Sequence, residues 1–112
     1  MGQMTRKVIN TAAGSTVEMV AAVSGKTIKV YDCFFALATA TTVDIKSATT
    51  TLTGVMTLAA SVIHHIGPIA IDPGDPVSSK AVPVLVCASG EALNFAFGGA
   101  VQTSGSLIYT QE

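Results

Sequence analysis

The amino-acid sequence predicts a single all-β domain, a sandwich or barrel of about eight short antiparallel strands. Val, Ile and Thr account for 35 of the 112 residues, whereas Leu occurs six times and Glu three times. Such β-branched side chains fit a pleated strand better than a helix. No window carries the apolar spacing of an amphipathic helix, and turn dipeptides recur at short intervals instead. A chain of this length has room for one core, so we expect one domain.

The predicted strands follow one another between these turns. In two of them the apolar residues alternate cleanly: Val43 and Ile45 are expected to face the core in one, and Leu93, Phe95 and Phe97 to share a face in the other. The expected ranges are 16–23, 27–38, 42–47, 51–53, 55–58, 62–66, 84–88, 91–97 and 101–110.

The longest predicted strand, 27–38, is apolar on both faces. We therefore expect it to be central in its sheet, or to meet a partner with one face. Its two faces carry, respectively, Tyr31, Cys33, Phe35 and Leu37, and Ile28, Val30, Asp32, Phe34 and Ala36.

Three other features complete the expected organisation. Gly105, inside the last strand, predicts a bulge or a close backbone contact. The segment from Asp72 to Pro76 predicts a loop, because its prolines lack backbone donors and its glycine permits a positive φ. Residues 1–14 have little periodicity, and we expect them to form an N-terminal arm beside a sandwich domain over residues 15–112.

Composition excludes several classes of function. Charged residues make up 12% of the chain, about half the usual share. A surface so poor in charge suits a protein whose faces are covered by neighbours. The net charge of −1 argues against nucleic acid, and only Arg6 and Lys7 lie together. We expect no membrane span and no signal peptide, and therefore synthesis in a cytosol.

No motif indicates catalysis or a metal site, so we expect a non-enzymatic protein without a cofactor. His64 and His65 point to opposite faces of a strand and cannot chelate one ion; one is expected to pack inward and the other to lie at the surface. Asp72 and Asp75 flank a glycine without the oxygen ligands of a calcium loop. There is no nucleophile elbow, and Gly25-Lys26-Thr27 lacks the upstream glycine of a phosphate loop.

The remaining chemistry-bearing side chains are expected in the core. Cys33 and Cys87 each lie in an apolar run, and we favour two free, buried thiols over a disulfide. The aromatic rings all fall in predicted strands and are interpreted as core, because a sugar-binding module usually exposes rings, often Trp, and this chain has no Trp.

Several blocks of the sequence resemble the jelly-roll cementing (decoration) proteins of tailed-bacteriophage capsids. A strand ending in Ser24-Gly25-Lys26 precedes the long apolar strand. The following blocks occur in the same order: Thr42-Val43-Asp44-Ile45-Lys46-Ser47, Thr51-Leu52-Thr53-Gly54, Gly90-Glu91-Ala92-Leu93-Asn94 and Gly105-Ser106-Leu107-Ile108-Tyr109. The resemblance covers about residues 17–109. The loop over residues 66–83 is longer and richer in proline than the family pattern.

The resemblance implies a jelly roll on the capsid exterior of a virion made in the host bacterial cytoplasm. It further implies the major capsid protein as partner and a homo-oligomer, a trimer or a dimer. No catalytic or ligand-binding residue comes with it. The partner-binding residues that we expect, from the arm and the proline-rich loop, are Met4, Thr5, Arg6, Lys7, Val8, Ile9, Asn10, Asp72, Pro73, Asp75 and Pro76.

Two other functions remain open on the sequence. The same sandwich could serve a phage tail as a receptor-binding module, or could bind a small ligand or sugar outside any virus. Copy number per particle separates the first of these from decoration, and binding to a glycan panel tests the second.

Overall fold

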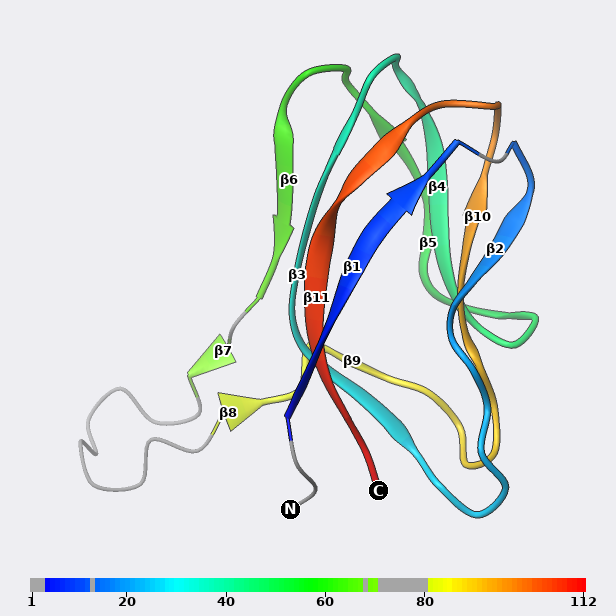
Figure 1. Cartoon of the computed structure of the whole chain (residues 1–112), viewed down its shortest axis with the longest axis vertical. Coiled ribbons are helices and arrows are strands. Elements are labelled where there is room, and N and C mark those ends of the chain that lie inside the picture. Colours follow the sequence, from blue (N-terminus) through cyan, green and yellow to red (C-terminus); the bar gives the residue numbers. More distant parts are fainter. Residues whose placement is uncertain (1–3, 13, 68, 71–80) are drawn as a thin grey trace.

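The computed structural model consists of two antiparallel β-sheets packed face to face, which confirms the predicted all-β sandwich (Figure 1). The structure describes residues 4–12, 14–67, 69–70 and 81–112. No helix occurs in these ranges.

The first sheet, here sheet A, has the strand order β1-β11-β3-β6, and β9 also pairs with β3. All of these pairings are antiparallel. Its strands are β1 (Thr5–Thr11), β3 (Ile28–Leu37), β6 (Ile63–Ile66), β9 (Leu85–Val86) and β11 (Thr103–Gln111).

The second sheet, sheet B, has the order β2-β10-β4-β5. It consists of β2 (Thr16–Val20), β4 (Thr41–Ser47), β5 (Thr50–Leu58) and β10 (Leu93–Phe97). The short strands β7 (Ile69–Ala70) and β8 (Ala81–Val82) pair only with each other, beside the sandwich (Figure 1).

The pairings are nested along the chain. In sheet A, β1 pairs with β11 and β3 with β6; in sheet B, β2 pairs with β10 and β4 with β5. The chain therefore behaves as one long antiparallel ribbon wrapped into two layers, with successive strands of each half alternating between the sheets.

The core lies between the sheets and consists of alternate residues of their strands. Val43, Ile45, Leu93 and Phe95 are fully buried and Phe97 nearly so, which confirms the faces predicted for β4 and β10. Phe95 packs edge-on against Phe35 of sheet A, with ring centroids 5.7 Å apart. Removing one such ring costs about 3–5 kcal/mol, so this pair is a main source of adhesion between the layers.

A bulge in β3 explains why that strand is apolar on both faces. Ile108 of β11 is opposite Asp32 and Tyr109 is opposite Val30, so Tyr31 is an extra residue in the ladder. The inward face therefore changes parity at Tyr31. Ile28 and Val30 are buried before the bulge, whereas Cys33, Phe35 and Leu37 are buried after it.

Gly54 does not end a strand, contrary to the sequence-based expectation of two short strands around it. β5 continues through Gly54, which has φ of 76°, by an irregularity opposite Ile45. There the Oγ1 of Thr53 accepts the backbone N–H of Ile45 at 3.2 Å, in place of the missing backbone partner. A side-chain hydrogen bond thus links β4 and β5 at the point where the sequence predicted the end of a strand.

Thr5–Thr11, within the segment expected to be an arm, form an edge strand of sheet A instead. β1 pairs along its whole length with β11, and Ile9 is fully buried in the core. The apolar character of Val8 and Ile9 gives this segment a place in sheet A, and the boundary expected at residue 14 therefore falls between two strands of one sandwich.

Gly105 permits the closest approach of two strands. It lies opposite Phe35, and a Cβ there would come within 2.7 Å of the Phe35 Cα. The predicted close backbone contact is therefore confirmed, whereas the bulge in this pair lies further along, at Tyr109.

Candidate binding surface

The described residues contain no group of three or more His, Cys, Asp or Glu side chains able to hold a metal ion. No helix among them is long and apolar enough to cross a membrane.

The two histidines lie on opposite faces of β6, as predicted. His64 is opposite Phe35 and its ring packs against the Phe35 ring, with centroids 5.7 Å apart, while its Nε2 is 3.0 Å from the carbonyl oxygen of Ala59. His65 faces outward, and its Nε2 is 2.6 Å from Oδ1 of Asp32. His64 thus completes the rim of the core, and His65 belongs to the outer surface of sheet A.

Both cysteines are free and buried. Burial raises the pKa of the Cys33 thiol to about 12, and the neighbouring Asp32 charge adds to this effect. Burial also raises the pKa of Cys87, against a hydrogen bond from Ser47. Neither thiol is therefore suited to act as a nucleophile near neutral pH.

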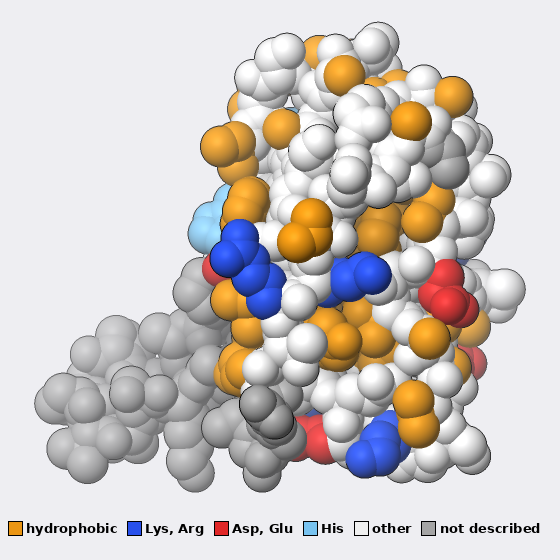
Figure 2. Space-filling view, viewed as in Figure 1, with side chains coloured by type: hydrophobic (Ala, Val, Ile, Leu, Met, Phe, Trp, Pro, Cys, Tyr) orange, Lys and Arg blue, Asp and Glu red, His pale blue; other side chains and the backbone are white. Residues whose placement is uncertain are grey.

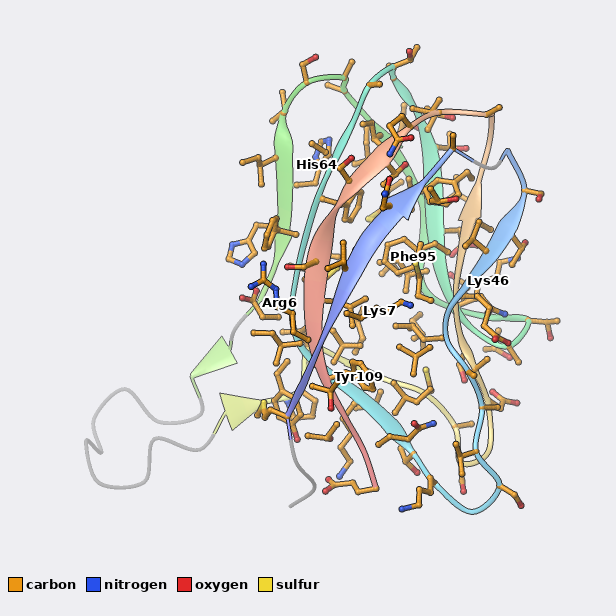
Figure 3. All side chains as sticks on the ribbon, viewed as in Figure 1. Arg6, Lys7, Lys46, His64, Phe95 and Tyr109 are labelled. Carbon is orange, nitrogen blue, oxygen red and sulfur yellow. The ribbon has the colours of Figure 1, made fainter. Side chains whose placement is uncertain are left out.

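The predicted partner-binding residues of the N-terminal segment divide between two faces of β1. Arg6, Val8 and Asn10 lie on the outer face of sheet A, whereas Thr5, Lys7 and Ile9 lie on the opposite side, and Ile9 is buried. Figure 3 shows Arg6 and Lys7 extending from β1 in opposite directions. Met4 precedes the strand and is 41% exposed.

Asp72, Pro73, Asp75 and Pro76, the loop residues expected to bind a partner, lie outside the described residues. The described residues on either side of them form the β7–β8 pair.

The outer face of sheet A carries exposed apolar residues from three strands, β1, β3 and β6. Val8 of β1 and Phe34 of β3 lie on either side of Ser106 of β11, and in the next row Ile63 of β6 is opposite Ala36. Val8 is 63% exposed, Phe34 37% and Ile63 69%. Large apolar side chains exposed near one another on a sheet face, here with Ser106 and Ala36 between them, suit an interaction site.

Charge on this face is sparse and lies at one end of it. Arg6, Ile108 and Asp32 are in register across β1, β11 and β3, and the carboxylate of Asp32 is bound by His65. Lys29, near the start of β3, also faces outward at this end, and its Nζ is 3.1 Å from the Glu112 carboxylate. The remaining described outward residues of these three strands are neutral. Figure 2, which views the side of the molecule on which β1 and β2 lie, shows a few Lys and Arg side chains across the middle and uncharged side chains over most of the rest.

Sequence reasoning missed the part of this surface that lies outside β1. It assigned Phe34 to the core with the other rings, but Phe34 points outward. Alternation put Phe34 on the face opposite Cys33 and Phe35, but Ile28 and Val30 share the parity of Phe34 and are buried, so alternation alone could not show that Phe34 is exposed. The exposure of Ile63 on this face was missed for a different reason. Its place on the face depends on the pairing of β6 with β3, which the local sequence pattern does not identify.

Comparisons of the chain with protein-family models, with curated proteins and with solved structures found no match.

Proposed function

We propose that this protein is a non-catalytic virion subunit, a decoration protein that binds major capsid subunits on the exterior of a phage shell made in a bacterial cytoplasm. The observation that supports this most directly is the outer face of sheet A. Val8, Phe34 and Ile63 are exposed there on a rigid sheet, with few charges around them. Such a face suits attachment to another protein, since the centre of an interface is depleted in charge.

We further infer that the sandwich is a jelly roll. The nested pairs β1/β11, β2/β10, β3/β6 and β4/β5 support this inference, because a jelly roll is a double ribbon of eight strands wrapped into two sheets. β7, β8 and β9 then form an insertion between β6 and β10.

The proposed work is mechanical. A subunit that binds only the assembled shell adds its binding free energy to that state. Attachment to several capsid subunits at once lets individually weak contacts sum to a firm one, because the later contacts form within the same complex.

The test uses shells that lack this protein, with the purified chain added back. The temperature at which the shells disrupt should rise with wild type. It should stay at the value of the bare shell with Phe34→Asp or Ile63→Asp, which place a charge in the apolar surface. Val23→Asp, at a 43% exposed site in the turn after β2, is the matched control and should act as wild type. Equal disruption temperatures with and without the wild-type chain would overturn the proposal.

A low-resolution image of the native particle separates decoration from a tail location. Density spread over the whole shell supports decoration, whereas density confined to one vertex supports a tail module.

A second candidate function, sugar binding, is favoured by one observation. The exposed ring of Phe34 lies beside the hydrogen-bonded His65–Asp32 pair, and a ring next to polar groups is a common way to bind a sugar. A thermal-shift screen of a glycan panel tests it: a glycan that raises the melting temperature of wild type but not of Phe34→Ala supports sugar binding.

A further inference from the structure

We propose that the free edge of β5 pairs antiparallel with β5 of a second copy of this chain, extending sheet B across a two-fold axis. This inference does not depend on the proposed function. It rests on which backbone groups of β5 have no partner strand among the described residues, and on the side chains around them.

Hydrogen-bond alternation identifies the unpaired groups of β5. The N–H of Gly98 donates to the carbonyl of Thr42, so Thr42 bonds toward β10. Ile45 directs its N–H the other way, toward Thr53 of β5. Alternate residues of β4 therefore bond to opposite neighbours, and Val43 bonds to its opposite residue Met56.

The same alternation leaves Val55 and Thr57 with their N–H and C=O groups directed away from β4. Both side chains lie on the outer face of sheet B and are exposed, and Val55 at 69% equals Ile63 as the most exposed large hydrophobic residue described. A strand with unpaired backbone groups is a template for another strand, so the occupant that fits it is an extended segment.

The other edge strands carry features that discourage pairing, whereas the one such feature described in β5, the irregularity at Gly54, lies before the regular segment 55–58. β1 has Arg6 and Lys7, and Lys7 points from its strand toward the gap between the sheets (Figure 3). β2 has Glu18, and β6 is four residues long with two histidines. β5 is nine residues long and contains neither a charged residue nor a proline. Charge, proline and shortness are the usual protections of a sheet edge.

A second copy of β5 is self-complementary to this edge. With the two-fold axis at Met56, Val55 of one copy is opposite Thr57 of the other. These two residues form a hydrogen-bonded pair, in which each N–H donates to the carbonyl of the other residue. The two-fold axis generates a second, identical pair. These cross-strand neighbours are β-branched, a favourable pairing on a sheet face. No charged residue of β5 opposes its own copy.

Neighbouring charges do not oppose this pairing. Asp44 of β4 accepts the hydroxyl of Thr51, and Lys46 lies 3.9 Å from its other oxygen. Across the proposed axis the two Asp44 residues are separated by three strand spacings, about 14 Å. That distance exceeds the Debye length at physiological ionic strength, about 8 Å.

The irregularity at Gly54 sets the length of the paired segment. The regular part of the β5 edge begins at Val55. The hydrogen bonds between the two copies therefore involve Val55 and Thr57, but not the residues that precede Gly54. So short an interface is weak on its own, and we expect association that depends on concentration.

The experiment measures association of the full chain by sedimentation equilibrium, and amide hydrogen exchange by NMR at low and high protein concentration. Wild type should form dimers as concentration rises. The amides of Val55 and Thr57 should gain protection at the same time, whereas those of Met56 and Leu58, already bonded to β4, should be protected at both concentrations.

Two variants test the register. Thr57→Pro removes a backbone N–H donor that does not bond to β4, and Val55→Lys places a charge on the edge. Each variant should raise the dimer Kd at least tenfold. The circular dichroism spectrum and the melting temperature of the monomer should stay unchanged. Val23→Lys, at an exposed site outside both β5 and the outer face of sheet A, is the matched control and should dimerise as wild type.

A wild type that stays monomeric throughout the concentration range would overturn the proposal. So would dimers that Val55→Lys leaves intact, which would place the contact on another surface. These measurements use no shells, so their failure is distinct from failure of the proposed decoration function.

Discussion

Gly105 is the residue at which β11 approaches β3 most closely. A Cβ at this position would overlap the carbonyl oxygen of Phe34 and lie within 2.7 Å of the Phe35 Cα. Both are backbone atoms of a central strand and cannot move aside without disturbing the ladder. We therefore expect Gly105→Ala to lower the free energy of unfolding by about 3 kcal/mol, measured by urea denaturation.

Gly99→Ala is the control for that substitution. The nearest atom to a Cβ there is Oγ1 of Thr41 at 3.6 Å, an ordinary contact. Its free energy of unfolding should stay within about 0.5 kcal/mol of wild type. If the two variants are equally stable, the close approach of β11 and β3 is not a constraint on the sequence.

Cys33 makes stability depend on pH in the alkaline range. Burial raises the pKa of its thiol from 9.0 to about 12, with a contribution from Asp32. Between these values the unfolded chain releases the thiol proton and the folded chain keeps it. The unfolded state then binds fewer protons, so the free energy of unfolding falls as pH rises above 9.0.

The variant Cys33→Ala isolates this effect. Near neutral pH it should be less stable than wild type by about 1–2 kcal/mol, because it leaves a small cavity. Above pH 9 the difference should shrink by about 1.4 kcal/mol for each pH unit, since the variant lacks the titrating group. Urea denaturation between pH 8 and pH 10.5 measures both values, and a difference that is constant over this range would contradict the prediction.

Among the elements, β5 depends on one hydroxyl to pass its irregularity. Oγ1 of Thr53 accepts the N–H of Ile45, and it also bonds the carbonyl oxygen of Gly54 at 2.8 Å. Thr53→Val keeps the shape but leaves the Ile45 N–H without an acceptor. We expect a loss of about 1–3 kcal/mol in the free energy of unfolding.

Thr57→Val is the matched control on the same strand, because Thr57 is exposed and its hydroxyl has no described partner. Measured by urea denaturation at concentrations where the chain is monomeric, it should be near neutral. A Thr53→Val variant as stable as this control would mean that the hydroxyl does not support the ladder.

At the scale of the whole molecule, sequence patterning predicted the sandwich and most of its core. Alternation placed Val43, Ile45, Leu93, Phe95 and Phe97 inward, because a strand's period of two is a local property. The pairing of distant strands was beyond that reasoning. Whether a segment such as β1 is an arm or an edge strand is decided by the strand that pairs with it, here β11, almost the whole chain away.

The candidate surface was predictable only in part, for the same reason. Arg6 and Val8 were expected to bind a partner and lie on the outer face of sheet A. Phe34 was placed on the face opposite Cys33 and Phe35 but interpreted as core, because the bulge at Tyr31 lets both faces of β3 carry buried residues at different points. A bulge is a property of two strands in register, which no pattern within one strand reveals.

The position of β11 between β1 and β3 has a consequence for the order in which the molecule folds. β11 is the strand that joins β1 to β3, and it is the last strand of the chain. Sheet A therefore cannot assemble in order from the N-terminus onward. Its closure joins segments separated by nearly the whole chain, and the entropy of closing that loop is lost before most native contacts form. Non-local topologies of this kind fold slowly. Until β11 is in place, β1 and β3 remain open strands able to pair with the wrong partner, and the time spent in that state sets the opportunity for misassembly.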